Sequence, residues 1–321
     1  MKTNRRKFLA TTGLISIGSL IPKYGFGSTK ISFDKLNTLP KFEIGAITYS
    51  YRSLPGNLYS IIGYCKESGI SDVELMANNV EAFLGIPYGG TWIRRNNPNY
   101  QQIKDEQKAW RESVSIDKFK NVKTLLDQAG ISVYAYKPSS IGPDNSDLEI
   151  EQSLMAAKVL GASSVTVEIN EGEKYATHTQ RLGDLGRKHG IYIGYHAHTQ
   201  ATDILWNNAL NQSNYNSINL DIGHYIARGK ENTSETLLTF IKNNHSRITS
   251  MHIKDRHHPD KGAENKPFGE GDTPILEVIK LVHSNGYKIP LSIEFEYKTP
   301  EKSNAVREVK KCLEYCKQAL I

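Results

Sequence analysis

Four β-rich runs in the second half of the chain each end in side chains that bind metals or transfer protons. These endings are Tyr195-His196-Ala197-His198, Leu220-Asp221-Ile222-Gly223-His224, Met251-His252-Ile253-Lys254-Asp255 and Ile293-Glu294-Phe295-Glu296. Because side chains alternate along a strand, residues two apart lie on the same side of it. Polar groups aimed into a protein interior are costly unless they bind something. We therefore expect one polar site where these strands end.

Two imidazoles and two carboxylates from these endings have the composition of a metal site. The predicted ligands are His196, Asp221, His252 and Glu294. Mixed nitrogen and oxygen ligation suits Mn, Co, Zn, Fe or Ni better than Ca, which prefers oxygen ligands alone. We expect one divalent metal ion, with Mn, Co, Zn and Mg as the candidates.

The same endings offer groups that transfer protons. Lys254 lies two residues after a predicted ligand, and we expect the metal and the interior to lower its pKa, making it a general base or an oxyanion stabiliser. A salt bridge to Asp255 or Glu270 is the structural alternative. Glu296 and His198 are the other candidates for the base, since each lies two residues from a predicted ligand.

Two carboxylates at the ends of earlier strands complete the set of candidates. Glu74 lies near the end of the second β-rich run, and Glu168 ends the fourth. We expect both to line the pocket or to bind substrate hydroxyl groups, as His198 would if it is not the base. The alternative is that they are carboxylates satisfied by neighbouring groups at the barrel end.

Short β-rich runs alternate with amphipathic stretches, which predicts a parallel sheet with right-handed crossovers. The expected strands are 43–50, 72–76, 132–137, 163–169, 191–197, 217–222, 248–254 and 290–295, and the last helix is 302–320. Gly69, Gly161 and Gly190 each stand where a helix gives way to a strand, because glycine accepts the left-handed conformation that ends a helix. Eight strand–helix units in about 280 residues predict a single (β/α)8 TIM barrel domain, 41–321. A doubly wound open sheet is the alternative, although no nucleotide-binding glycine loop follows the first strand.

One connection is longer than a barrel needs. The interval between Met76 and Ile116 is rich in Asn, Gly, Arg and aromatic residues, whereas a βα connection needs only a few residues. We expect an insertion after strand two, 77–116, on the face where barrel active sites form, and a role for it in covering the substrate. A surface elaboration or a dimer contact is the alternative.

A twin arginine lies near the start of the chain. Asn4-Arg5-Arg6-Lys7-Phe8-Leu9 leads into an apolar run that ends at Ile21, and Gly25-Phe26-Gly27 follows it. The run has about 13 residues, fewer than the about 20 that cross a bilayer. This order resembles a twin-arginine export signal, 1–27, before a tether, 28–40. It implies a periplasmic or otherwise exported protein that folds before export; a basic tail is the alternative.

The formal net charge of +6 comes mostly from this N-terminal segment. Five of the 40 Lys and Arg residues lie in 1–27, which contains no acid, so the remainder has 35 basic against 34 acidic residues. This balance argues against a nucleic-acid partner. With 38% hydrophobic and 23% charged residues, the composition excludes a disordered or multi-span membrane protein. Cys65, Cys312 and Cys316 fit neither a disulfide framework nor a zinc finger.

The chain resembles the xylose isomerase-like TIM barrels, the sugar phosphate isomerase/epimerase superfamily, over roughly residues 41 to 318. The segments that carry the resemblance are Leu220-Asp221-Ile222-Gly223-His224, His252-Ile253-Lys254-Asp255, Phe268-Gly269-Glu270-Gly271 and Ser292-Ile293-Glu294-Phe295-Glu296. The resemblance implies one metal ion at the carboxyl face of the barrel, bound by Asp221, His252 and Glu294. It also implies that His224 binds substrate or lies in the outer shell of the metal.

The chain departs from the ketose epimerases of this family at one position. Those enzymes have a glutamate where this chain has His196, and they use it with the strand-eight glutamate as a proton-transferring pair. The strand-eight glutamate is Glu294 here, so it stays a candidate catalytic group. Without its partner, simple two-carboxylate epimerisation is not expected, and Lys254, Glu296 or His198 must supply the missing function.

A metal at this position would stabilise an enediolate formed by loss of a proton beside a carbonyl. Return of the proton gives isomerisation or epimerisation, and loss of a β-substituent gives elimination. We expect a sugar isomerase/epimerase-like enzyme acting on an unphosphorylated sugar or keto-sugar, because sugar phosphates are cytoplasmic metabolites.

Two alternatives are kept for the function. The first is a lyase or hydratase that acts on a 3-keto-glycoside or a related keto-sugar, and the second is a non-catalytic carbohydrate-binding barrel. The export signal argues against an apurinic-site endonuclease. A small carbohydrate is the expected partner, without stable membrane insertion after signal removal, and a homo-oligomer is left open.

Overall fold

In a computed structural model of the protein, the described residues are 44–90, 96–170 and 172–321. The expected export signal and tether, 1–40, lie outside them, so both stay predictions. Residues 42–321 form one unit by their internal contacts. Within the described part of the chain, no helix is long and apolar enough to cross a membrane.

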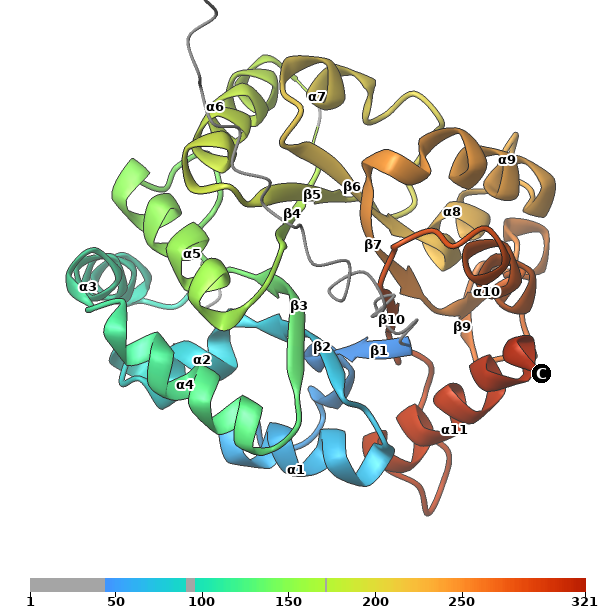
Figure 1. The fold of residues 1–321 in the computed structure, drawn as a ribbon, viewed down its shortest axis with the longest axis horizontal. Coiled ribbons are helices and arrows are strands. Elements are labelled where there is room, and N and C mark those ends of the chain that lie inside the picture. Colours follow the sequence, from blue (N-terminus) through green and yellow to red (C-terminus); the bar gives the residue numbers. More distant parts are fainter. Residues whose placement is uncertain (1–43, 91–95, 171) are drawn as a thin grey trace, which may run out of the picture. The chain divides into compact units, whose positions relative to one another are not determined.

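Eight parallel strands of this unit close into a barrel (Figure 1). They are β1 (Ile44–Ile47), β2 (Asp72–Met76), β3 (Ser132–Lys137), β4 (Ser164–Glu168), β5 (Tyr192–His196), β6 (Asn216–Asp221), β7 (Ile248–Ile253) and β10 (Leu291–Ile293). Their order around the barrel is β1-β10-β7-β6-β5-β4-β3-β2, with β1 hydrogen-bonded to both β10 and β2. The TIM barrel is therefore confirmed, and the open doubly wound sheet is wrong.

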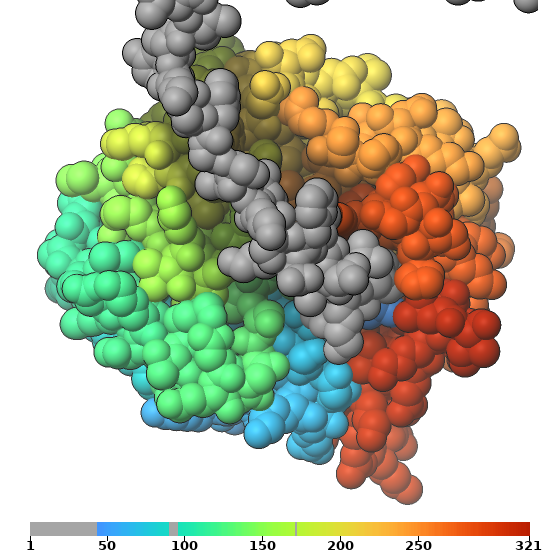
Figure 2. Space-filling model, viewed as in Figure 1, coloured from blue at the N-terminus to red at the C-terminus, as the bar shows by residue number. Residues whose placement is uncertain are grey.

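Helices surround the barrel (Figure 1). On the molecular surface in Figure 2, the colours run around the barrel unit in sequence order. The helices outside the insertion are α1 (Leu58–Ser68), α4 (Asp117–Gln128), α5 (Asp147–Leu160), α6 (Glu173–His189), α7 (Asn207–Gln212), α8 (Ile222–Arg228), α9 (Ser234–Asn244), α10 (Ile275–Ser284) and α11 (Ala305–Lys317). Short 3-10 turns occupy Thr48–Tyr51, Pro87–Gly90, His245–Arg247, Pro259–Lys261 and Gln318–Leu320. A two-stranded antiparallel sheet, β8 (Asp255–Arg256) with β9 (Asn265–Lys266), follows β7.

The glycines that mark the predicted helix ends have the expected backbone conformation. Gly69, Gly161 and Gly190 end α1, α5 and α6 with φ of 79°, 95° and 70°. A side chain is strained at such angles, so these helices stop where the sequence predicts. The core between strands and helices is aliphatic, and Leu75, Ile193 and Ile253 are each fully buried in it.

The insertion after the second strand contains two helices, α2 (Ala77–Phe83) and α3 (Tyr100–Ser113). Helix α3 packs against α5 on the outside of the barrel. Residues 91–95 lie outside the described residues. The described part of the insertion is therefore mainly helical and is held against the outside of the barrel by α5. Its role in covering a substrate stays a prediction.

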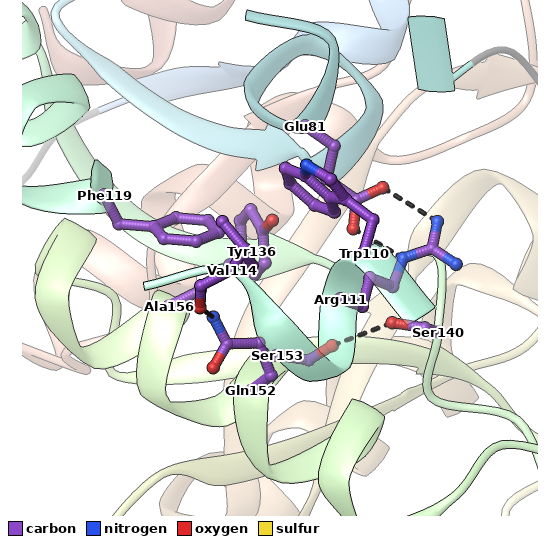
Figure 3. Close-up of a pocket in the computed structure, with 10 residues that line it drawn as sticks. All are labelled: Glu81, Trp110, Arg111, Val114, Phe119, Tyr136, Ser140, Gln152, Ser153 and Ala156. Atoms are coloured by element: carbon purple, nitrogen blue, oxygen red, sulfur yellow. Dashed lines mark hydrogen bonds and ion pairs between the residues drawn. The ribbon is translucent and has the colours of Figure 1, made fainter. Parts of the chain in front are cut away.

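A buried ion pair anchors α3 (Figure 3). Arg111 donates from Nε and Nη2 to the two carboxylate oxygens of Glu81, at 2.8 and 2.9 Å. Its Nη1 lies 3.8 Å from Glu149, whose other oxygen accepts from Asn145 and the backbone of Ser146. Burial alone lowers the pKa of a guanidinium, but Glu81 holds the Arg111 pKa above its usual value. Each charge here is paired, as the stability of a buried charge requires.

Candidate metal centre

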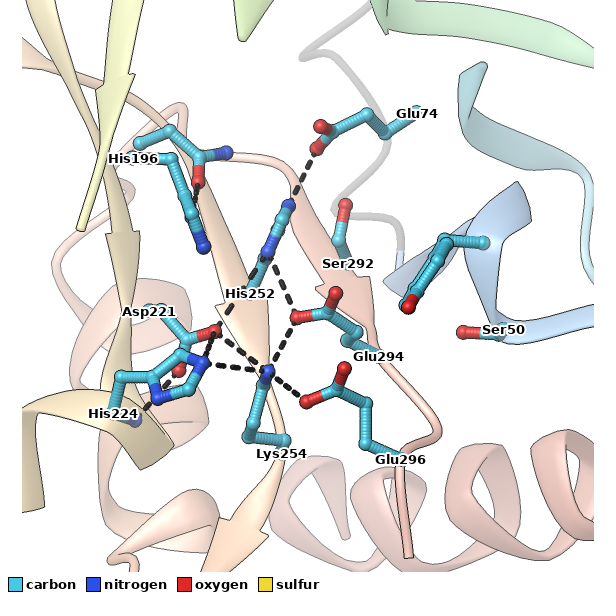
Figure 4. A network of polar contacts seen from close by, with 12 residues as sticks. Ser50, Glu74, His196, Asp221, His224, His252, Lys254, Ser292, Glu294 and Glu296 are labelled. Carbon is cyan, nitrogen blue, oxygen red and sulfur yellow. Dashed lines mark hydrogen bonds and ion pairs between the residues drawn. The ribbon is translucent and has the colours of Figure 1, made fainter. Parts of the chain in front are cut away.

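The structure brings eight predicted site residues into one polar cluster at the carboxyl ends of the strands (Figure 4). They are Glu74, His196, Asp221, His224, His252, Lys254, Glu294 and Glu296. Strand register accounts for the convergence. Asp221 pairs with His252 across β6 and β7, and His252 pairs with Ser292 across β7 and β10. Because β10 ends at Ile293, Glu294 follows just beyond the strand end.

The centre of the cluster contains buried polar atoms without hydrogen bonds. Among the described residues, Asp221 Oδ2, His252 Nδ1 and Glu294 Oε2 are buried and make no hydrogen bond, although Lys254 Nζ lies within ion-pair distance of both carboxylate oxygens. His252 Nδ1 lies 3.1 Å from Glu294 Oε2 and 3.8 Å from Asp221 Oδ2. Buried polar atoms are normally satisfied, so several that converge without hydrogen bonds indicate a ligand position.

These atoms have the chemistry and spacing of a divalent-metal site. One ligand atom each from His196, Asp221 and His252 lies within 4.8 Å of the other two, and Glu294 adjoins His252. Three of the four predicted ligands form this group, which suits an ion that accepts nitrogen and oxygen together. Glu294 is not a member of the group, and its role as the fourth ligand stays a prediction. His196, His198 and His224 form a second group with the same spacing. Since both groups use His196, we treat them as parts of one centre.

Asp221 has two roles, one for each carboxylate oxygen. Its Oδ1 accepts the backbone N–H of His224 at 2.7 Å and caps α8, which starts directly after β6. That leaves Oδ2 for the centre of the cluster. Lys254 packs so closely against Gly223 that no larger residue fits there, because a Cβ at position 223 would lie 2.3 Å from Cγ of Lys254.

Glu74 orients His252 through a buried hydrogen bond. Both side chains are fully buried, and His252 Nε2 donates to Glu74 Oε2 at 2.8 Å. This bond leaves Nδ1 of His252 to face Asp221 and Glu294. Burial lowers the pKa of His252, but Glu74 and Glu294 outweigh it and raise the pKa to about 10, so the ring is protonated without an ion and a bound metal would replace the Nδ1 proton. Oε1 of Glu74 is buried without a hydrogen-bond partner among the described residues, and the binding of substrate hydroxyls by Glu74 stays a prediction. A carboxylate behind a ligating histidine is a common support for metal sites.

His196 is held by a polar partner of a different kind. Its Nδ1 lies 2.7 Å from Oδ1 of Asn219, and Nδ2 of Asn219 donates to Ser250 at 2.7 Å. All three side chains are buried. Burial, followed by the neighbouring His252 and Lys137, lowers the pKa of His196 to about 3. His196 is therefore neutral at pH 7, as a metal ligand must be.

Lys254 lies among three carboxylates. Its Nζ is 3.1 Å from Asp221, 2.7 Å from Glu294 and 2.6 Å from Glu296. Burial lowers the pKa of Lys254, but these carboxylates outweigh burial and raise it above its usual value. The predicted lowering of the Lys254 pKa is therefore wrong for the protein without a metal ion, because its own carboxylates raise that pKa. The expected bridge to Asp255 is also wrong, because that carboxylate accepts backbone N–H groups from a glycine-rich loop.

His224 lies between two cations. Its Nε2 is 3.2 Å from Lys254 Nζ, and its Nδ1 is 2.5 Å from Nη1 of Arg256. Burial, then Lys254 and Arg256, lowers the pKa of His224 to about 2. His224 is thus a neutral group next to the cluster, consistent with the outer position predicted for it.

Three side chains form the accessible edge of the site on β3, β4 and the end of β5. Lys137 Nζ contacts Glu168 at 2.8 Å, and Glu168 lies 3.8 Å from Nδ1 of His198. The side chains of Glu168 and His198 are 43% and 55% exposed. Burial raises the pKa of Glu168, but Lys137 and His196 lower it to about 2. Glu168 and His198 are therefore open to a ligand, as predicted, although Glu168 is already paired.

Comparison with known proteins identifies the family. The family model described as "Xylose isomerase-like TIM barrel" matches residues 65–318. The chain belongs to this family. Among curated proteins no sequence matches the chain.

Solved structures of low sequence identity share the xylose isomerase-like barrel. A sugar phosphate isomerase/epimerase from Parabacteroides distasonis is 16% identical with a TM-score of 0.56, covering 85% of this chain and 94% of that one. The IOLI protein with a bound zinc atom is 14% identical with a TM-score of 0.59, covering 87% and 98%. The probable 3-DHS dehydratase AsbF from Bacillus anthracis is 15% identical with a TM-score of 0.59, covering 86% and 98%.

Sequence reasoning missed four polar residues of the centre. They are Lys137, Asn219, Ser250 and Arg256. Asn219 lies two residues before Asp221, at same-face spacing, and Lys137 ends a predicted strand, so strand periodicity could have found both. Ser250 and Arg256 carry no comparable signal, because only the packing of neighbouring segments places them.

Proposed function

We propose that the protein is a divalent-metal-dependent enzyme that removes a proton beside a carbonyl of an unphosphorylated sugar or keto-sugar. The observation that carries the proposal is the convergence of buried ligand atoms from His252, Asp221 and Glu294, which make no hydrogen bond within the described part of the chain, beside the Lys254–Glu296 pair. The relatives described as an isomerase/epimerase and a dehydratase support this class of chemistry. At their low identity they support it through the fold alone.

His196, Asp221, His252 and Glu294 would hold the ion. A divalent ion supplies Lewis-acid stabilisation for negative charge that develops on substrate oxygens. The two histidines favour Zn, Co or Mn over Mg, which prefers oxygen ligands. The relative with bound zinc is consistent with this preference.

Glu296 is our candidate for the base. It is not among the four ligands, and its side chain is 20% exposed while that of Lys254 is 3% exposed. A substrate at the mouth therefore reaches Glu296 before Lys254. Lys254, held 2.6 Å away, stabilises the developing oxyanion and can return a proton. A base of this kind contributes about 10²- to 10⁴-fold to rate.

The arrangement favours reactions that use one face of the substrate. Glu296 and Lys254 lie together after β10 and β7, which are neighbouring strands. Across the barrel on β4, Glu168 has a pKa lowered to about 2 by Lys137 and His196 despite its burial, which makes it a poor proton acceptor. One-sided transfer fits isomerisation, or elimination from a keto-sugar as the second candidate. Both fit better than two-base epimerisation.

The experiment follows deuterium from D₂O into a panel of free ketoses, aldoses and 3-keto-glycosides, with Zn, Co or Mn supplied. Wild type is expected to exchange or convert at least one of them. Glu296→Gln is expected to lose about 10²- to 10⁴-fold in kcat while retaining the metal. Glu314→Gln, an exposed carboxylate on α11, is the matched control and should keep wild-type activity.

Two results would contradict the proposal. The first is wild type without stoichiometric divalent metal after reconstitution. The second is sugar binding without exchange or turnover, unchanged in Glu296→Gln and Lys254→Met, which indicates the carbohydrate-binding barrel. Export stays a separate prediction, tested by locating the mature chain in cell fractions with Arg5 and Arg6 intact or replaced by lysine.

A further inference from the structure

We infer that Asn219 is a positioning residue that fixes the tautomer of His196, so that Nε2 presents its lone pair to the metal. This inference rests on the metal centre of the proposed function. It assigns a role to two buried residues, Asn219 and Ser250, that sequence motifs did not single out.

The three side chains form one row across adjacent strands. His196 of β5 is in register with Asn219 of β6, and Asn219 is in register with Ser250 of β7. Their exposed fractions are 2%, 0% and 0%. Parallel register thus places all three at one level of the barrel, out of contact with water.

The hydrogen bonds along the row give the carboxamide a direction. Nδ2 of Asn219 donates to Ser250 Oγ at 2.7 Å, and Oδ1 lies 2.7 Å from His196 Nδ1. In this orientation the carboxamide oxygen accepts, so Nδ1 of His196 carries the proton. A neutral imidazole has one proton, and Nε2 therefore keeps its lone pair. A rotated carboxamide would reverse both bonds, place the proton on Nε2 and block coordination.

The two histidines of the centre are held in opposite ways. Glu74 accepts from Nε2 of His252, which leaves Nδ1 for the ion, whereas Asn219 accepts from Nδ1 of His196, which leaves Nε2. A carboxylate also adds negative charge, and an amide does not. Asn219 therefore orients His196 without adding a fifth acid to a centre that already contains Glu74, Asp221, Glu294 and Glu296.

The test reads the tautomer directly in the full chain labelled with ¹⁵N-histidine. Long-range ¹H–¹⁵N spectra are recorded with a chelator present, and the His196 signal is assigned from its loss in His196→Gln. Wild type is expected to show the Nδ1–H tautomer. Asn219→Leu is expected to lose this preference and to bind Zn about 10- to 100-fold more weakly by chelator competition, as expected for loss of a metal-supporting residue.

Two further variants keep the test decisive. Asn219→Asp can only accept, so it should retain the Nδ1–H tautomer and bind Zn more tightly than Asn219→Leu. Ser217→Ala removes another buried hydroxyl of β6, which bonds Ile193 and Thr249, and it should leave the His196 signal and Zn affinity unchanged. If Asn219→Leu does not fold by circular dichroism, the wild-type and Asn219→Asp spectra still decide the tautomer.

The outcomes separate this inference from the proposed function. An Nε2–H tautomer in wild type, or unchanged Zn affinity in folded Asn219→Leu, overturns the role of Asn219 and leaves the metal enzyme standing. Wild type that binds no divalent metal overturns the proposed function. The tautomer measurement needs no metal and is read in either case.

Discussion

The ion pair that anchors α3 and the polar cluster at the strand ends are both buried, but their charges are paired differently. In the first, Arg111 is paired through two hydrogen bonds with Glu81 and lies near Glu149, whose other oxygen is also bonded. In the second, Asp221, His252 and Glu294 bring buried atoms together without hydrogen bonds. In the first cluster each charge has a partner of opposite sign, whereas in the second Lys254 is shared among the carboxylates of Asp221, Glu294 and Glu296. A surplus of buried negative charge that converges from several strands indicates a cation.

Burial therefore does not distinguish a structural cluster from a functional one. Both clusters are nearly inaccessible to water, and both perturb the pKa values of their members. What distinguishes them is whether the protein itself supplies enough positive charge for its buried carboxylates. Removing a charge from each cluster should therefore have different consequences for stability and for metal binding.

Arg111→Met should destabilise the fold by about 3 to 5 kcal/mol, because it leaves the buried charge of Glu81 without a partner. Zinc stoichiometry should stay that of wild type. Urea unfolding and metal analysis measure the two quantities. The double variant Glu81→Met with Arg111→Met removes both charges and should recover most of the loss; a metal deficit in folded Arg111→Met contradicts the separation of the clusters.

Zinc should stabilise wild type against unfolding, since an ion that binds only the folded state adds about 2.7 kcal/mol at 100 times its Kd. Excess chelator should reverse the effect. His252→Ala should lose the stabilisation by zinc. Arg111→Met should keep it, although its stability without zinc is lower than that of wild type. Thermal unfolding with and without metal gives the comparison, and an equal zinc effect in His252→Ala would mean that the ion binds elsewhere.

His178 has one buried nitrogen without a hydrogen bond in the described part of the chain, and it lies apart from the polar cluster at the strand ends. Its Nε2 donates to the carbonyl of Ile141 at 2.9 Å, and its buried Nδ1 has no hydrogen-bond partner among the described residues. Burial lowers the pKa of His178 below 6.5. The unfolded chain then binds more protons below pH 6.5, so this histidine contributes stability at pH 7 that is lost as the pH falls.

His178→Gln should accordingly show a smaller fall in urea midpoint between pH 7 and pH 5 than wild type. Zinc affinity should be unchanged, because one isolated atom does not make a site. An identical pH dependence in the variant would show that His178 does not contribute to the pH dependence of stability. An altered zinc affinity would contradict the view that a metal site needs several converging ligand atoms.

The fold was largely predictable because its signals are local. The observed strand β5, Tyr192–His196, lies within the predicted 191–197, and β2 and β3 coincide with their predictions. The glycine positions that end helices were also correct. Periodicity and backbone preference act over a few residues, so a single sequence displays them.

The sequence predicted which residues form the site better than it predicted what each residue does there. Glu74 and His252 are 178 positions apart in the sequence, and only barrel closure makes them a hydrogen-bonded pair. Lys254 was expected to have a lowered pKa, but the carboxylates around it raise the pKa above its usual value even against burial. A strand motif gives the direction of a side chain; it does not give the charges that other strands bring to it.

The sequence by itself thus determined the eight strands and the residues at their ends, because side-chain alternation and helix-ending glycines are properties of neighbouring residues. Only the tertiary structure decided which of these groups are satisfied and which nitrogen of each histidine faces the ion. Those properties depend on register between strands and on exclusion of water. Both arise when the barrel closes and places Asn219 beside His196 and Glu74 beside His252.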